Sequence, residues 1–594
     1  MDNKQKLELT WIGKGEEPKL EPRILIEDSE KSYGDKNTEN MLIHGDNLLA
    51  LKALEQEYAG RVKCIYIDPP FNTGAAFDNY DDNMEHSIWL SLMRQRLRIL
   101  FNLLCKDGTI YVHIDDKEMA YLKIVMDEVF SRENFLNMIV IKTSDPSGHK
   151  TVNPSPYSQT EYLLMYTKDR NCYKYETQYI LSNYDNMYGR IVTNKYQNYK
   201  DWEIESLSEY LARELGFENS KEAKATIGKL DFEAKKAEYA LNNADRVFQP
   251  TAISNAAGRN IVEIREASKS NLGKVYCVRR DEYEDVYILD GRQMYFYSSK
   301  VKEIEGYKTP AKPLTNLWTD IPWNGIAKEG TVVFKNGKKP EKLLKRCIEI
   351  STRRGDYVLD SFLGSGTTAA VAHKMNRKWI GIELGDHCDT HCLPRLKMVC
   401  DGTDQGGISK AVGWKGGGGF RYYNLAPSLL KQDKYGNWII DERYNADMLA
   451  AALAKQENFT YCPDETIYWK QGRSTEKDYL FTTTAFMTVE RLDKIHEEMQ
   501  PDESLLICCK SFQSECEDRF SNITIKKIPK MLLGRCEFGK DDYSLNIISM
   551  PVDPNEPEFV PQGMKNIIGG TKKKTVVNDT GDLFENGDNG GEDE

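Results

Sequence analysis

Short apolar runs alternate with stretches of helical periodicity in two separate parts of the chain, and this alternation constrains the fold more than any other feature. In the first part, three apolar runs have the length of strands: Met41–His44, Val62–Ile67 and Thr109–Ile114. Apolar residues recur at helical spacing between 48 and 58 and between 86 and 104. Strands that alternate with helices predict an α/β fold with a mostly parallel sheet.

The same rhythm returns after a long interruption. Its helices and strands are expected at Glu341–Ile350, Tyr357–Leu359, Thr367–Met375 and Lys378–Ile382. Between the two parts, residues 141–315 are rich in Tyr, Asn, Ser and charge, and they contain a strongly helical stretch, Ser206–Asn243. We interpret this interruption as a separate inserted module.

Composition is that of an ordinary soluble globular protein, with 40% hydrophobic and 29% charged residues in 594. No apolar stretch reaches the roughly 18 residues that a membrane helix needs, and no signal-peptide core precedes residue 20, so we expect a cytoplasmic protein without membrane contact. Thirteen cysteines suit reduced thiols. The cluster His387–Cys392 invites a zinc site, but it lacks a second ligand pair, and we favour a helix with incidental Cys and His and no metal.

A net charge of −12 argues at first against a protein that binds nucleic acid. Residues 140–350, however, carry 33 Lys and Arg against 29 Asp and Glu, a net charge of +4. A basic face on the middle module is therefore compatible with the sequence, because electrostatic steering depends on local charge.

The first candidate site follows the apolar run at 62–67, where the sequence reads Asp68-Pro69-Pro70-Phe71. Open α/β sheets bind ligands at the carboxyl ends of their strands. Two consecutive prolines fix the backbone and remove N–H donors, which leaves carbonyl oxygens facing outward. A carboxylate, a rigid carbonyl and an aromatic ring side by side suit a planar amine. Asp-Pro-Pro is also an ordinary strand terminator, which would leave Phe71 in the core.

The second candidate site is the segment from Asp360 to Thr368, between a strand and a helix. Its glycines let the backbone pass close to a ligand at a helix N-terminus. Glu383 ends the next strand, where a carboxylate can bind ribose hydroxyls. A nucleoside cofactor fits this pattern, and NAD is a competitor, although Ala369 stands where the dinucleotide fingerprint has its third glycine.

Together the two motifs resemble those of the amino-methyltransferases of DNA, which combine a DPPY-like catalytic motif with an FxGxG cofactor motif. The order, with the catalytic motif first, is similar to that of the beta class. Over about residues 1–425 the chain resembles the modification subunits of type III restriction–modification systems. That likeness rests on Leu7–Trp11, Ile43–Leu48, Leu317–Ile321, Asn336–Glu341 and the glycine run before Phe420.

The resemblance implies methyl transfer from S-adenosylmethionine to N6 of an adenine flipped out of double-stranded DNA. Its catalytic motif is Asp68, Pro69, Pro70 and Phe71. Asp68 and the Pro69 carbonyl would accept hydrogen bonds from the exocyclic amine, and Phe71, where Tyr is commoner, would stack on the ring. The implied cofactor residues are Asp46 at the adenine, Glu383 at the ribose, and Asp360, Phe362, Gly364, Gly366 and Thr367. Lys339 precedes a helix that would abut the cofactor, although we favour a solvated lysine there.

The resemblance also divides the chain into parts around a Rossmann-like class I methyltransferase sheet, permuted so that the catalytic half comes first. The parts are the catalytic half at 1–140, a target-recognition domain at 141–315, the cofactor-binding half at 316–424, a C-terminal domain for dimerisation or partner binding at 425–570 and a disordered acidic tail at 571–594. The relatives suggest a homodimer that joins a nuclease–helicase restriction subunit.

Several alternatives stay open at this point. The chain could be a solitary DNA methyltransferase, or it could methylate cytosine N4, RNA or a protein amide. Aspartate rather than Ser or Asn before Pro-Pro favours adenine by resemblance. An NAD-dependent oxidoreductase would leave Asp68–Phe71 unexplained, and the intact motifs argue against an inactive specificity subunit.

Overall fold

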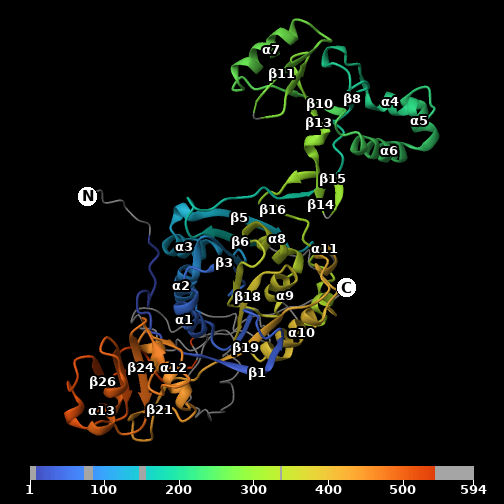
Figure 1. Ribbon diagram of the computed structural model, residues 1–594. Helices are drawn as coiled ribbons and strands as arrows, with labels where there is room; N and C mark the ends of the chain where they lie inside the picture. The colour runs from blue at the N-terminus through green and yellow to red at the C-terminus, as the bar shows by residue number, and fades with distance from the viewer. Residues whose placement is uncertain are drawn as a thin grey trace, which may run out of the picture.

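Ten strands form one large mixed sheet in the computed structural model (Figure 1), which describes residues 8–72, 85–145, 156–281, 283–304, 306–334, 337–541 and 543. Their order is β1-β19-β2-β18-β17-β3-β4-β6-β5-β16. The strands are β1 (Leu25–Gly34), β2 (Met41–His44), β3 (Val62–Ile67), β4 (Leu104–Ile114), β5 (Phe135–Lys142), β6 (Thr160–Thr167), β16 (Leu317–Trp318), β17 (Tyr357–Asp360), β18 (Lys378–Glu383) and β19 (Gly419–Leu425). Every neighbouring pair from β19 across to β4 is parallel, which confirms the predicted α/β class.

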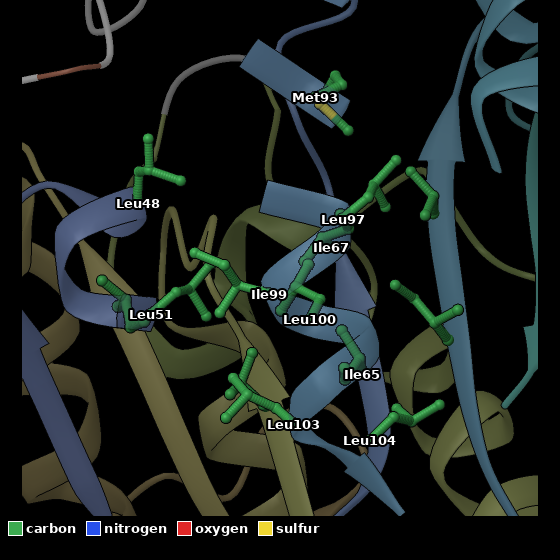
Figure 2. Packing of buried hydrophobic residues seen from close by; sticks show 14 of the residues in the cluster. Leu48, Leu51, Ile65, Ile67, Met93, Leu97, Ile99, Leu100, Leu103 and Leu104 are labelled. Carbon is green, nitrogen blue, oxygen red and sulfur yellow. The ribbon is translucent and has the colours of Figure 1, made fainter. Parts of the chain in front are cut away.

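Helices pack on both faces of this sheet. They are α1 (Asn47–Tyr58), α2 (His86–Leu103) and α3 (Met119–Phe130) on one face, and α8 (Glu341–Ser351), α9 (Thr367–Lys374) and α10 (Leu393–Asp401) on the other. Strand β3 shows why both faces are apolar. Ile65 and Ile67 pack with the first group of helices, as Figure 2 shows, while Cys64 and Tyr66 pack with the second. Successive side chains of a strand point to opposite faces, so an uninterrupted apolar run is required.

The chain leaves the large sheet after β6 and returns to it at β16. In between lie a six-stranded sheet, ordered β11-β12-β13-β10-β8-β9, and a three-stranded sheet, β14-β15-β7. The strands are β7 (Tyr179–Leu181), β8 (Arg190–Val192), β9 (Ile204–Ser206), β10 (Val247–Ala252), β11 (Val275–Val278), β12 (Val286–Leu289), β13 (Arg292–Phe296), β14 (Val301–Ile304) and β15 (Tyr307–Pro313). Figure 1 shows the six-stranded sheet standing away from the large sheet, with β14 and β15 between them.

The helical stretch expected at Ser206–Asn243 is confirmed, but as three helices. They are α4 (Leu207–Glu214), α5 (Ser220–Ile227) and α6 (Lys229–Asn242), and α7 (Arg259–Lys269) follows. Gly216 and Gly228 adopt positive φ between them, a conformation that interrupts a right-handed helix.

The boundary expected at residue 141 lies inside β5, and β6 after it still belongs to the large sheet. Strand β6 pairs antiparallel with both β4 and β5. An antiparallel neighbour needs no helical crossover, so the alternation of strands and helices gave no sign of it.

A second α/β unit follows β19. It contains β20 (Leu430–Gln432), β21 (Trp438–Ile440), α12 (Ala446–Gln456), β22 (Thr460–Tyr461), β23 (Gly472–Arg473), β24 (Asp478–Thr483), α13 (Val489–Glu498), β25 (Ser504–Cys509) and β26 (Ile523–Lys527). Strand β25 lies inside a five-stranded sheet, ordered β22-β23-β24-β25-β26. The acidic segment 571–594 lies outside the described residues. Within the described part of the chain, no helix combines the length and apolar character needed to cross a membrane.

Short helical elements complete the described fold. They are α11 (Ser409–Val412), the π-helix η6 (Cys388–Cys392) and the 3-10 turns η1 (Arg132–Asn134), η3 (Tyr199–Asp201), η4 (Tyr297–Lys300), η5 (Ile326–Thr331) and η7 (Ser514–Cys516). Cys388 and Cys392, the cysteines of the suspected zinc cluster, are buried in the apolar core under the sheet. Core packing explains their presence.

Candidate active site

Four acidic residues lie at one edge of the large sheet, at the carboxyl ends of neighbouring parallel strands. Asp46 follows β2, Glu383 ends β18, Asp360 ends β17 and Asp68 follows β3. The register pairs Leu359 with Ile65 across β17 and β3. The two motif loops, almost 300 residues apart in the chain, therefore meet at adjoining strand ends.

The first motif loop places Asp68 between two cationic or potentially cationic side chains. Its Oδ2 lies 2.8 Å from Nζ of Lys339. Its Oδ1 lies 3.8 Å from Nδ1 of His113, and this buried oxygen has no hydrogen-bond partner among the described residues. A buried acceptor without a donor is costly, and Oδ1 of Asp68 retains acceptor capacity for one more N–H group.

The rest of this loop is fixed by the helix above it. Trp89, fully buried on α2, donates from Nε1 to the Pro70 carbonyl over 2.8 Å. The Phe71 ring packs at the margin of the core, with its centroid 5.7 Å from that of His113. Asn72 follows with φ of +57°. The Phe71 ring thus packs against the core and also borders the Asp68 loop. Thr73 and Gly74, next in the motif, lie outside the described residues.

Behind Asp68 lies a buried polar chain that sequence reasoning missed. Nδ1 of His113, on β4, is 2.8 Å from the Tyr66 hydroxyl, and Nε2 is 2.7 Å from Oε2 of Glu161 on β6. Burial alone would raise the pKa of Glu161, but the hydrogen bond and charge of His113 and the charge of Lys339 lower it to about 2. Glu161 is therefore an ionised carboxylate inside the site.

Lys339 corrects our expectation of a solvated lysine. Its side chain is 11% exposed and forms the ion pair with Asp68 just before α8. Burial favours the neutral amine, but the charges of Asp68 and Glu161 outweigh it and raise the pKa of Lys339. The motif that contains it was noticed in the sequence, but nothing in its spacing pointed to β3.

The second motif loop supplies hydrogen-bond donors to its own aspartate, Asp360. Asp360 is 3% exposed, and it accepts hydrogen bonds from the Phe362 backbone over 2.9 Å and from the Thr368 hydroxyl over 2.5 Å. Burial nevertheless raises the pKa of Asp360 to about 7, and the nearby charges of Asp68 and Glu383 contribute. This acid is therefore partly protonated at neutral pH.

The glycines of this loop meet the conditions expected of them. Gly364 and Gly366 have φ of +57° and +78°, a region that L side chains avoid. A Cβ added at Gly364 would have its nearest neighbour 4.0 Å away, so this side of the loop is open to a ligand. The Gly364 N–H donates to Oε2 of Glu383 over 2.6 Å, which joins the two strand ends.

Three of the predicted cofactor residues have structural partners inside the protein. Asp46 caps α1, with Oδ1 accepting from the Leu49 backbone over 2.9 Å. The Thr367 hydroxyl accepts from Arg395 over 2.7 Å, so its observed partner lies inside the protein. Oε1 of Glu383 lies 2.9 Å from Nε2 of His387. These contacts fix the loops in position whether or not the residues also bind a cofactor.

Comparison with known proteins identifies the class that this fold and site define. Residues 62–390, more than half of the chain, match the family model of DNA methylases that act on amino groups (N6/N4), and the chain belongs to this family. The match spans both motif loops and the module inserted between them.

Among individual relatives, the chain is 39% identical over 416 residues to a probable type III restriction-modification enzyme, the HindVI Mod subunit of Haemophilus influenzae, covering 66% of this chain and 54% of that one. It is 26% identical to the EcoP15I Mod subunit of Escherichia coli, covering 63% of each. It is 28% identical to the type II methyltransferase M.EcaI of Enterobacter cloacae, covering 58% of this chain and 66% of that one. The chain thus spans about half to two thirds of the length of these curated relatives.

Proposed function

We propose that the chain transfers a methyl group from S-adenosylmethionine to N6 of an adenine flipped out of double-stranded DNA. The observation that carries this proposal is the meeting of the Asp68 loop and the Asp360 loop at adjoining strand ends. A methyl donor on one loop and an acceptor amine on the other would then face each other. Membership of the DNA methylase family supports the same reaction.

The proposed acceptor fits the atoms around Asp68. Adenine N6 is a poor nucleophile because its lone pair is delocalised into the ring. Asp68 and the Pro69 carbonyl would accept its two N–H groups and favour a more tetrahedral nitrogen, and Oδ1 of Asp68 has the unused acceptor capacity for this. Phe71 would stack on the extruded base and offset part of the unstacking cost.

The proposed cofactor fits the second loop. When bound, S-adenosylmethionine supplies an activated methyl group on a positively charged sulfur. Asp360 and Glu383 offer carboxylates to its charged and hydroxyl groups, and Phe362 and the open side of Gly364 provide a surface for it. Gly366 leads into α9 at the same edge. Asp46 and Thr367 stay in the proposed set as well, although each has a partner in the protein, as Asp360 and Glu383 also do.

The finer fold assignment is part of the same proposal. A parallel run in which β2, β18 and β17 meet β3 and β4 is what a class I methyltransferase sheet with its catalytic half first would require. We propose residues 1–140 and 316–424 as the two halves, and 141–315 as the target-recognition domain, with its start moved beyond β6. Exchanging this module with that of a relative would then change the methylated sequence.

We further propose that the protein is the modification subunit of a type III restriction–modification system. The names of its relatives support this assignment, as does the second α/β unit from β20 to β26, which we propose for dimerisation or contact with a restriction subunit as part of the domain at 425–570. Of that domain, residues 542 and 544–570 lie outside the described residues. The match to a type II methyltransferase keeps a solitary enzyme as the alternative. Size-exclusion chromatography with light scattering tests the dimer.

The decisive experiment is methylation by the purified chain and its Asp68→Ala variant, with mass spectrometry of the hydrolysed DNA. We expect N6-methyladenine from the wild type and at least about 100-fold less from Asp68→Ala, with cofactor binding retained. Asp116→Ala, at an exposed position after the neighbouring strand β4, is the matched control and stays active. N4-methylcytosine as the product would replace adenine as the substrate, and full activity of Asp68→Ala would remove Asp68 from the mechanism.

A further inference from the structure

One side chain, Lys339, contacts both groups that the proposed target adenine needs. Its ammonium lies 2.8 Å from Oδ2 of Asp68 and 5.0 Å from the centroid of the Phe71 ring. The first contact is on the carboxylate whose other oxygen, Oδ1, would accept the exocyclic amine, and the second is a cation–π contact on a ring where a base would stack. Lys339 thus binds the site in the way expected of the substrate.

We propose that Lys339 is a built-in substitute for the target amine, which pairs with Asp68 in the free protein and moves to Glu161 when the base enters. The inference rests on the proposed function, since it concerns the same pocket. It adds a step that base flipping alone does not contain: the incoming adenine must displace an ammonium group of the enzyme. Lys339 is in this sense a positioning and selectivity residue.

The need for an internal cation follows from the burial of Asp68. The side chain of Asp68 is 20% exposed, and a largely buried carboxylate without a counter-charge is strongly unfavourable. The Lys339 ammonium stabilises it while no base is bound. The charges of Asp68 and Glu161 keep Lys339 protonated despite burial, so the substitute is a cation throughout.

The ammonium cannot keep this position during methyl transfer. Positive charge develops on N6 as it bonds to the methyl carbon, and a cation on the same carboxylate would repel it. The ammonium would also share the face of Phe71 with the base. Displacement therefore removes both an electrostatic and a steric obstacle.

Glu161 is the natural second position for the ammonium. His113 joins it to Asp68, with Nδ1 3.8 Å from Oδ1 of Asp68 and Nε2 2.7 Å from Oε2 of Glu161. The charge of Lys339 also helps to lower the pKa of Glu161 to about 2, so Glu161 is an ionised carboxylate. A carboxylate can accept from more than one donor, so it can hold His113 and Lys339 together. The positive charge would then stay in the pocket, paired, instead of being expelled into water.

This arrangement would favour entry of the adenine at the recognition sequence over bases elsewhere in the DNA. A base enters only if the binding free energy of its contacts with Asp68 and Phe71, together with that of the other protein–DNA contacts, exceeds the free energy lost when Lys339 leaves. An adenine at the recognition sequence has that support, and a transiently opened base elsewhere does not. Removing the ammonium should therefore make flipping easier and less selective.

The test uses the full chain and duplex DNA carrying the recognition sequence, first defined by methylation-sensitive sequencing, with 2-aminopurine beside the target adenine to report its flipping. We expect Lys339→Met to raise the flipping equilibrium constant by about threefold to tenfold, and to lower KM for DNA more than it changes the single-turnover rate. Lys342→Met, on the same segment but 47% exposed and paired with Asp320, is the matched control and should change neither quantity.

The second arm tests the movement to Glu161. Glu161→Gln removes the charged second position, so it should lower the flipping constant in the wild type. It should have little effect in the Lys339→Met background, since no ammonium then needs a new partner. Equal effects in both backgrounds would show that Glu161 acts independently of Lys339, and would overturn the proposed movement.

Two further outcomes are informative. If Lys339→Met does not fold, Lys339→Gln keeps a neutral donor at the same position and should also raise flipping. Unchanged flipping and KM in a folded, cofactor-binding Lys339 variant would reject the substitute role while leaving the methyltransferase assignment intact. A wild type that neither methylates DNA nor alters the 2-aminopurine signal would instead reject the proposed function itself.

Discussion

The two motif loops both begin with an aspartate at the end of a strand, but the environments of the two aspartates differ. Asp68 and Asp360 lie at the carboxyl ends of the adjacent strands β3 and β17. Asp68 is partly exposed and pairs with a lysine that lies about 270 residues further along the chain. Asp360 is buried, is held by hydrogen bonds from its own loop and has a pKa raised to about 7.

One sheet edge can therefore hold two carboxylates in environments that suit different ligands. Asp68 pairs with Lys339 and retains one acceptor oxygen without a partner, which suits a neutral amine donor. Burial without a counter-charge leaves Asp360 poised to ionise, which suits a ligand that brings its own positive charge. The environment of Asp68, the proposed site of the methyl acceptor, thus depends on a cation from a distant part of the chain. The environment of Asp360, the proposed site of the methyl donor, depends on its own loop.

After Asp68→Ala, the largest effect should come from a change confined to the Asp68 loop, where we propose that the target adenine binds. Phe71→Ala removes the proposed stacking surface, and the loss of one aromatic stack costs about 1–3 kcal/mol, which corresponds to roughly fivefold to 150-fold in productive DNA binding. The affinity for S-adenosylmethionine should change less than about twofold, because the Asp360 loop is untouched. Single-turnover methylation and cofactor calorimetry on the same variant measure both sides.

Phe71→Tyr serves as the control, since it preserves the ring and restores the residue commoner at this position in such motifs. It should retain nearly full activity. If Phe71→Ala weakened the cofactor as much as the DNA, the two loops would not be functionally separate, and the comparison would fail.

A somewhat smaller effect should come from pH, which should change the affinity for S-adenosylmethionine through the ionisation of Asp360. The pKa of Asp360 is raised to about 7 in the free protein, and a cationic cofactor would stabilise the ionised form and lower it. Binding should then release a proton, and cofactor affinity should rise with pH through the region near 7, by up to about tenfold between pH 6 and 8. Calorimetry in buffers of different ionisation enthalpy measures the proton release.

Asp360→Asn cannot ionise and should abolish this pH dependence while weakening binding overall. The raised pKa also affects stability. The free energy of unfolding should increase as the pH falls from about 7 toward 3.8, the pKa of Asp360 in the unfolded chain, because the folded protein binds the proton more tightly. A cofactor affinity that does not vary between pH 6 and 8 in the wild type would contradict the role of Asp360.

How far the site could be predicted follows from the same contrast. The partners of Asp360 lie within eight residues of it, so its loop, its glycines and Glu383 at the end of the next strand were identified from the sequence. The partners of Asp68 come from β4 and the segment before α8, and Glu161 of β6 lies one step further, against His113. No local pattern brings these segments together, and we expected Lys339 to be solvated and missed His113 and Glu161.

The fold shows the same limit. Periodicity predicted the strands and helices that alternate, because burial on both faces of a parallel sheet leaves a continuous apolar run. It did not predict that β6 inserts antiparallel between β4 and β5, since an antiparallel strand carries no helical crossover to mark it. Glu161, the residue of β6 in the site, was missed for that reason.

The smallest and most specific effect should come from a single hydroxyl. Thr368, buried at the start of α9, donates to Oδ2 of Asp360 over 2.5 Å, and this bond lowers the pKa of a carboxyl that burial raises. Thr368→Val keeps the shape and removes the donor, so the pKa of Asp360 should rise further. The pH at which cofactor affinity increases should then move upward by less than about one unit.

Thr367→Val is the matched control for this shift. Its hydroxyl accepts from Arg395 and is not among the donors to Asp360, so the variant can lose stability without moving the pH midpoint. An upward shift confined to Thr368→Val would show that Asp360 is tuned from within its own loop. An equal shift in both variants would attribute it to a general loosening of α9, and a downward shift would remove Asp360 as the titrating group.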